Sequence, residues 1–177
     1  MMKLVVAFCV FALLACSPVQ ARPALPDAPA DPALITRFTN IIWPTIVDNR
    51  GYNQGDPQSP NPRKDRFWSV VDSQSDANIH QEATSMGTTT GPDGFIATGP
   101  GDSIKLISAS VATLTSTDAT VAACYTYISK TVDEVVSNAP GTPMASEVTF
   151  DLHKSKDWLV RSITNDHVVP NCEASKA

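Results

Sequence analysis

The segment Met144-Ala-Ser-Glu-Val-Thr-Phe-Asp-Leu-His153 decides the fold class. Apolar side chains occupy one set of alternate positions, Met144, Val148, Phe150 and Leu152, and the opposite set is Glu147, Thr149, Asp151 and His153. A β-strand turns successive side chains to opposite faces of its sheet, so this pattern predicts a strand with one buried and one wetter face. Strands of that kind are typical of antiparallel sheets.

Neighbouring segments repeat the period of two. Residues 118–128 place four side chains on one face, namely Val121, Ala123, Tyr125 and Tyr127. Residues 103–112 and 157–165 also have the composition of strands. Lys154-Ser155-Lys156 predicts a short turn, and residues 129–143 predict a longer loop. We therefore expect a four-stranded antiparallel meander.

Helical periodicity precedes the strands. Asp31-Pro32 predicts a helix start, because Asp is a favoured N-cap and Pro a favoured first residue. Pro44 is expected to kink or end this helix, since proline has no backbone N–H to donate. The predicted apolar stripe of the helix consists of Leu34, Ile35, Phe38, Ile41, Ile42 and Ile46.

Two more amphipathic segments are expected before the strands. The first covers residues 66–73, after a loop at 49–65. The second begins with Ser75 or Asp76 as its cap and runs to about Met86, where Gly87 ends it. Segregated helices and strands predict an α+β fold, with the helices packed on one face of a curved, cone-shaped sheet. The tryptophans expected to anchor its core are Trp43, Trp68 and Trp158.

The first residues have the layout of a signal peptide. Lys3 precedes the apolar run Leu4–Ala15, whose twelve residues are fewer than the roughly twenty that a membrane span needs. Two processing routes are open. Leu13-Leu14-Ala15-Cys16 resembles the bacterial lipobox, which would put a lipid on Cys16; ordinary cleavage would follow Val19-Gln20-Ala21. We expect residues 1–21 to direct the chain to secretion or to a lipid-anchored position in the cell envelope.

A proline-rich segment follows the leader. Pro23, Pro26, Pro29 and Pro32 recur every third residue, as in a polyproline II helix. Residues 22–33 are therefore expected to form a semi-rigid tether of roughly 37 Å, and a disordered N-terminus is the alternative. Residues 34–172 are long enough for a single α+β domain, and 173–177 form a tail.

Charge and cysteine content narrow the function classes. Without residues 1–21 the chain has 12 basic and 18 acidic residues, and no run of Lys or Arg, which argues against nucleic-acid binding. Two cysteines remain outside the leader, Cys124 and Cys172. In an oxidising compartment they are expected to form one disulfide, the alternative being two buried thiols.

Several segments together are similar to a known superfamily. They are Ile104, Leu106 and Ile107, then Asp118–Val121, Glu147–Leu152 and Trp158–Ile163. These segments resemble the C-terminal half of the nuclear-transport-factor-2-like, or cystatin-like, superfamily. With its leader, tether and cysteine pair, the chain looks most like small secreted proteins and lipoproteins of mycobacteria and related actinobacteria. The resemblance implies three helices over the concave face of the sheet, with a pocket between them.

The same resemblance suggests where to look for chemistry. Enzymes of that fold place an acid or a His–Asp pair inside the cone, often with a tyrosine donor. The pocket candidates are therefore His80 with Asp76 or Glu82, and Tyr125 or Tyr127; a solvated helix face and core aromatics are the alternatives. No residue is assigned as catalytic and no cofactor is expected. No metal site is predicted, because the three histidines have no ligand spacing.

Fold alone does not choose a function, because members of the superfamily include ligand binders, isomerases, dehydratases and modules that only pair with proteins. The expectation is an exported non-enzymatic module that binds an envelope protein or a small apolar ligand, and a homodimer through the sheet face is one form it could take. One alternative is a small isomerase- or hydrolase-like enzyme that uses the cone. The other is a structural, antigenic or phage-exclusion surface protein.

Overall fold

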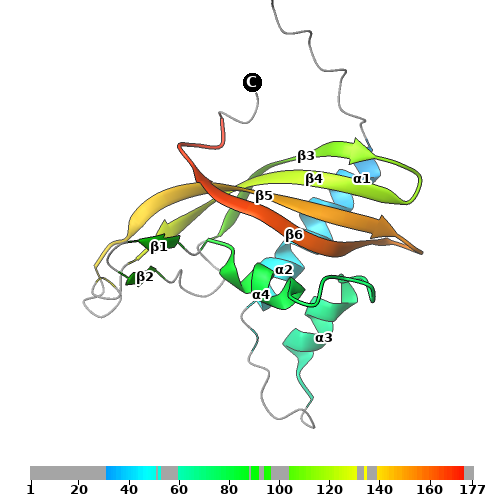
Figure 1. Cartoon of the computed structure of the whole chain (residues 1–177), viewed down its shortest axis with the longest axis horizontal. Helices are drawn as coiled ribbons and strands as arrows, with labels where there is room; N and C mark the ends of the chain where they lie inside the picture. The colour runs from blue at the N-terminus through cyan, green and yellow to red at the C-terminus, as the bar shows by residue number, and fades with distance from the viewer. Residues whose placement is uncertain are drawn as a thin grey trace, which may run out of the picture.

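A computed structural model of the chain describes most of the predicted domain (Figure 1). The described residues are 31–50, 52, 60–87, 89–91, 94–96, 104–130, 134 and 139–173, with backbone alone described in 89–91 and 94–96. The predicted leader with Cys16, most of the tether and the end of the tail lie outside these ranges. Among the described residues, no helix is both long and apolar enough to cross a bilayer.

Helical segments come first and a four-stranded antiparallel sheet follows, so the α+β class is confirmed. The helical segments are α1 (Pro32–Arg37), a π-helical turn (Phe38–Ile42), α2 (Trp43–Asn49), α3 (Pro62–Ser69) and α4 (Ile79–Ser85). A hairpin, β1 (Thr89–Gly91) and β2 (Gly94–Ile96), precedes the sheet. The sheet strands are β3 (Lys105–Leu114), β4 (Asp118–Ser129), β5 (Thr142–Lys154) and β6 (Trp158–Val169), in the meander order β3-β4-β5-β6.

The central strands β4 and β5 pair along their whole lengths and carry the predicted two-faced pattern. Val148, Phe150 and Leu152 of β5 are buried, and the residues between them are half-buried. The helices lie on one side of this sheet (Figure 1). We call the face toward the helices the inner face and the opposite face the outer face.

Aromatic side chains join the π-helical turn and α2 to the inner face. Phe38 meets Phe150 edge to face at 5.1 Å between ring centroids, and Trp43 lies 5.5 Å from Tyr125 and 6.0 Å from Phe150. Phe38, Tyr125 and Phe150 are completely buried. Such pairs add roughly 0.5–1.5 kcal/mol each beyond the burial of their apolar area.

The helix does not end at Pro44, contrary to one of the two predicted outcomes. Instead the chain makes the π-helical turn directly before it, and Trp43 N–H donates to the carbonyl of Phe38, five residues back. The turn falls where an α-helical bond is already missing because proline has no N–H. The extra residue per turn shifts the phase of the apolar stripe, so Ile41 is 45% exposed and not buried as predicted.

The two later helices begin at other positions than predicted. Helix α3 starts at Pro62, four residues before the expected 66, because the Asn61 side chain accepts hydrogen bonds from the backbone N–H groups of Arg63 and Lys64. Trp68 on this helix is 41% exposed, and its indole N–H donates to the Tyr52 hydroxyl, so it is not the core anchor that was expected.

Helix α4 starts at Ile79, later than predicted, because the residues before it pair with the edge of the sheet. Val71 forms a parallel bridge with Val160, and Asp76 N–H donates to the carbonyl of Arg161. The predicted caps Ser75 and Asp76 therefore lie outside the helix. Gly87 ends it as predicted, with a φ of 69° that favours glycine.

The predicted disulfide is present and lies on the outer face. Cys124 and Cys172 are bonded, with their Cα atoms 5.5 Å apart. Because Ala123 and Tyr125 belong to the main core, Cys124 between them points the other way. There it forms a small separate cluster with Ala145 and Cys172, against which Val169 packs. The bridge thus fastens the end of the chain across the outer face.

The two tryptophans Trp158 and Trp68 test this assignment of the core. Trp158 is 6% exposed, so Trp158→Ala should lower the free energy of unfolding by about 3–5 kcal/mol. Trp68→Ala should cost less than this, since 41% of its surface is already exposed to solvent and less apolar area is lost with the side chain. Urea unfolding followed by circular dichroism measures both. Equal losses in the two variants would show that the last strand is misplaced.

The disulfide should stabilise the domain by lowering the conformational entropy of the unfolded chain. It closes a loop across a sequence separation of 48, for which the chain-entropy relation gives roughly 4 kcal/mol. The double variant Cys124→Ala/Cys172→Ala should lose about this much while keeping the fold, because the main core is on the inner face. Dithiothreitol should destabilise the native protein and leave the double variant unchanged. If the native protein and the double variant had the same urea midpoint of unfolding, this role for the disulfide would be contradicted.

Candidate functional site

The structure separates the predicted pocket residues into two groups. Tyr125 and Tyr127 lie together on the inner face of β4, with ring centroids 5.7 Å apart. His80 lies on α4 against the rings of Tyr52 and Phe67, at 4.1 and 5.4 Å between centroids. Asp76 is exposed and precedes the helix, and no hydrogen bond or ion pair joins it to His80 among the described residues. The predicted i, i+4 pair is therefore wrong.

The environment of His80 is apolar. Its Nε2 atom is buried and has no hydrogen-bond partner among the described residues. Burial lowers the pKa of His80, because a charged imidazolium would lose its hydration between two aromatic rings. This burial disfavours the charged imidazolium, and no charged group among the described residues offsets it. This arrangement favours a packing role for His80.

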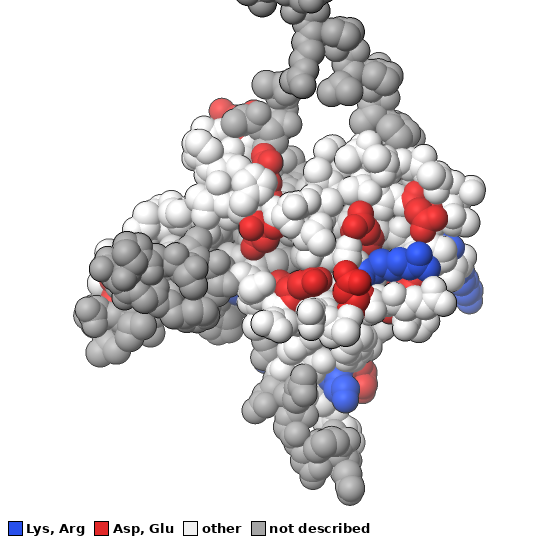
Figure 2. Space-filling view, in the orientation of Figure 1, with Lys and Arg blue, Asp and Glu red and all other residues white. Residues whose placement is uncertain are grey.

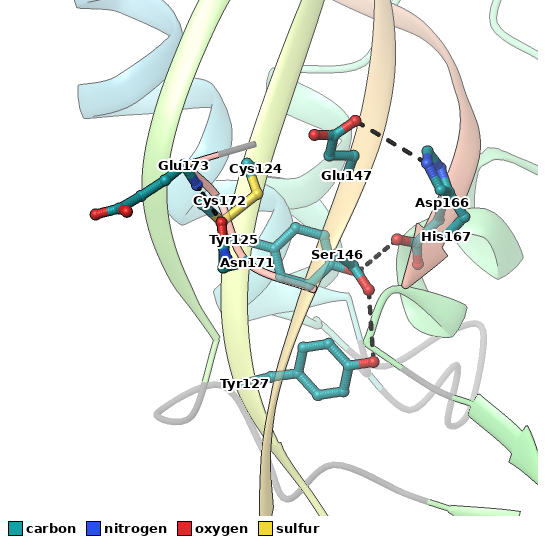
Figure 3. The surroundings of a disulfide bond; sticks show 10 residues. All are labelled: Cys124, Tyr125, Tyr127, Ser146, Glu147, Asp166, His167, Asn171, Cys172 and Glu173. Atoms are coloured by element: carbon teal, nitrogen blue, oxygen red, sulfur yellow. Dashed lines mark hydrogen bonds and ion pairs between the residues drawn. A yellow bond between two sulfur atoms is a disulfide. The ribbon is translucent and has the colours of Figure 1, made fainter. Parts of the chain in front are cut away.

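Tyr125 belongs to a polar network that the sequence analysis did not identify. Its hydroxyl donates to Asp166 Oδ1 at 2.6 Å and accepts from the backbone N–H of Gly87 at 2.7 Å. Gly87 N–H also lies 3.3 Å from Asp166 Oδ2. The network joins β4, β6 and the end of α4. Figure 3 shows Asp166 reaching toward Tyr125, and Ser146 placed toward the hydroxyl of Tyr127.

A bulge in β6 brings Asp166 into this network. Glu147 pairs with His167 and Thr149 pairs with Thr164, so two residues of β6, Asn165 and Asp166, oppose the single residue Val148. Asn165 adopts a left-handed conformation with a φ of 55°, which asparagine tolerates better than most residues. Such bulges re-aim side chains at sheet edges and functional sites.

The carboxyl group of Asp166 is held in an unfavourable environment for a charge. Desolvation raises its pKa, although the Tyr125 hydroxyl and the Gly87 amide act in the opposite direction. The pKa of Tyr125 is raised by burial and by the negative charge of Asp166. The buried Arg50, whose guanidinium donates to the carbonyl of Met86, attracts Asp166 electrostatically. This network ties the end of α4 to the sheet and keeps one carboxyl group poorly solvated.

The outer face of the sheet has two neighbouring depressions. The first, the central hollow, has a volume of about 490 Å³ and crosses all four strands; its walls include Ser108, Ser110, Ala122, Glu147, Thr149 and His167. The second, the apolar groove, has a volume of about 640 Å³ and is lined by residues that include Thr126, Pro143, Ala145, Val169, Pro170 and Cys172. The disulfide lies between them, because Cys124 borders the central hollow and Cys172 the apolar groove.

Small side chains create the central hollow. Ser108, Ser110 and Ala122 do not fill the space above the sheet, so a ligand can approach the backbone there. Glu147 and His167 stand at one side, with 4.0 Å between the carboxylate and Nε2. Both side chains reach solvent, at 33% and 60% relative exposure. Hollows of this size with a few polar groups are the usual form of ligand sites.

Charge is unevenly distributed over the molecule. Figure 2 shows more acidic than basic side chains on the face turned to the viewer. On the outer face, Asp118 accepts from His153 at 2.8 Å and Asp151 binds Thr120 and Ser162. Among the described residues there is no group of three or more metal-ligating side chains.

Sequence reasoning did not single out Asp166, Arg50 or Glu147. Asp166 lies beyond the predicted end of the last strand, and a signal for it exists in the Asn-Asp-His sequence at 165–167, since asparagine in a strand favours a bulge. No sequence pattern pointed to Arg50, because it lies just after a helix and belongs to no recognisable motif. Glu147 was predicted on the wetter face of its strand, but the hollow beside it is lined by residues of all four strands.

Comparison with known proteins adds no assignment. No family model matches the sequence, and neither the curated proteins nor the solved structures give a significant match.

The pKa of Asp166 has a measurable consequence for stability. Because burial raises this pKa above 3.8 in the folded state, protonation favours folding, and the contribution is lost as the pH rises through the folded-state pKa. Asp166→Asn imitates the protonated carboxyl group. We expect it to raise the melting temperature at pH 7, with a gain that shrinks toward pH 3.5.

Asp118→Asn is the matched control for this measurement. Hydrogen bonds from Thr117 and His153 lower the pKa of Asp118, so its contribution is present at neutral pH and lost in acid. Its replacement should therefore lower the melting temperature at pH 7. A lower melting temperature at pH 7 in the Asp166→Asn variant would show that the Asp166 charge is favourably paired and would contradict the poor solvation of this carboxyl group.

Proposed function

We propose that the protein is an exported, non-catalytic binding module whose ligand or partner occupies the outer face of the sheet. The observation that carries this proposal is the central hollow, which lies on the face opposite the helices and has small, polar and solvent-accessible walls. The inner face is packed with aromatic rings, and the hydroxyl of Tyr125 is enclosed by the network described above. These features favour a structural role for the inner face and a recognition role for the outer face.

Export is part of the same proposal. The disulfide Cys124–Cys172 is of the kind that persists in oxidising compartments, and the leader sequence directs the chain toward one. A bridge that fastens the final residues over the outer face also fixes the wall between the two depressions. The resemblance to the nuclear-transport-factor-2-like superfamily stays a prediction, and the proposal does not depend on it.

Site-specific photo-crosslinking in the producing cells tests the proposal. A photoreactive side chain at Ser110 should form a covalent adduct, because Ser110 lines the central hollow. The same side chain at Arg63, which is exposed on α3, should form none above background. Adding Ala122→Trp to the variant that is photoreactive at Ser110 should fill the hollow and abolish the adduct without changing the melting temperature. Equal adducts at both positions, or an adduct that survives Ala122→Trp, would overturn the proposal.

A further inference from the structure

We infer that the outer face binds an extended peptide segment of a protein partner, with an apolar side chain in the apolar groove and a lysine or arginine beside Glu147. The inference rests on the proposed function and specifies the chemistry of the occupant. It is carried by the position of the two depressions on the same strands, by their different linings and by the charge of the protein.

The two depressions are neighbours on both central strands. On β5, Ala145 lines the apolar groove and Glu147 lines the central hollow; on β4, Thr126 and Cys124 do the same. In each strand the two residues are separated by one position and point to the same face, so these adjoining wall residues of the two sites are roughly 7 Å apart along the strand. This is the distance between alternate side chains of an extended peptide, which fits a ligand with an apolar residue and a basic residue at i and i+2.

The apolar groove selects a hydrocarbon side chain. Pro143, Ala145, Val169 and Pro170 line it together with the disulfide, and its polar neighbours Thr126 and Asn171 are uncharged. Burying a leucine or isoleucine side chain there would contribute roughly 1.5–3 kcal/mol before the costs of association. Ile128 lies two residues after Thr126 on β4, so its side chain is on the same face. It is 37% exposed and extends the apolar surface.

The central hollow selects a positive charge. Among the described residues that line it, Glu147 supplies the one carboxylate, and none is a lysine or an arginine. The chain outside the leader has 12 basic and 18 acidic residues, so a basic segment would also be attracted over longer range. A lysine or arginine could lay its aliphatic stem over Ala122 and place its charged end at Glu147.

Nuclear magnetic resonance titration of the isotope-labelled, oxidised protein tests the inference. The probe is acetyl-Gly-Ser-Leu-Ser-Lys-Ser-Gly-amide, which places leucine and lysine at i and i+2. Two control peptides replace the lysine by glutamate or the leucine by serine. We expect saturable shifts of backbone amides in residues 122–126 and 144–149 with the first peptide, and at least tenfold weaker binding of each control peptide.

Variants of the protein locate the charge. Glu147→Gln should weaken the leucine–lysine peptide about tenfold. Asp151→Asn, a carboxylate on the same strand and face that lies outside the linings of both depressions, should change the affinity less than twofold. Equal binding to Glu147→Gln and to the native protein would overturn the inference, as would shifts confined to the helices.

The outcomes distinguish the inference from the proposed function. Equal binding of the glutamate peptide at the outer face would contradict the basic partner but support a recognition role for that face. An absence of outer-face shifts with every peptide would overturn the inference, and the crosslinking experiment would still decide the proposed function. Sedimentation velocity could instead show a dimer, and dilution of that dimer could shift the amide resonances of the outer face. Together these two results would mean that a second copy of the chain occupies the face, which would also overturn the inference.

Discussion

The packing of Phe38 and Trp43 against Phe150 and Tyr125 is the contact on which the rest of the structure depends. It joins the π-helical turn and α2 to the two central strands, and it requires β4 and β5 to turn every second side chain toward these helical segments. A register slip of one residue would exchange the two faces of a strand, so the aromatic positions fix the register of the whole sheet. The residues that alternate with these aromatic positions point to the outer face and determine its surface.

Those remaining positions account for the two depressions. Between the buried residues of β4 lie Ala122, Cys124 and Thr126, which are too small to form a second core. The bridge from Cys124 to Cys172 supplies a local substitute by fastening the end of the chain there. Asp166 belongs to the other side of the sheet, where the bulge at Asn165 directs a poorly solvated carboxyl group toward Tyr125. The fold thus keeps its main hydrophobic core on one face, while the other face carries the disulfide and two open depressions.

Sequence reasoning succeeded where one local rule governs the structure. Alternation in residues 144–153 predicted β5 and its buried face, and compartment chemistry predicted the disulfide. It failed where distant contacts compete with a local rule. Ile41 fits the helical stripe, but the π-helical turn Phe38–Ile42, just before Pro44, rotates it outward. Asp76 can cap a helix, but its backbone pairs with β6 instead. The site residues Asp166 and Glu147 acquire their surroundings from four strands and a bulge, so no short motif reveals them.

A pair of lysine substitutions at adjacent positions of β5 tests the division into a packed inner face and an open outer face most directly. The Val148 side chain is 1% exposed on the inner face, whereas the next residue, Thr149, is half-buried on the outer face beside the central hollow. Urea unfolding should show that Thr149→Lys changes the free energy of unfolding by no more than about 0.5 kcal/mol. Val148→Lys should lose several kcal/mol or fail to fold, because it buries an unpaired charge. Similar stabilities of the two variants, whether both high or both low, would contradict the division of the sheet into these two faces.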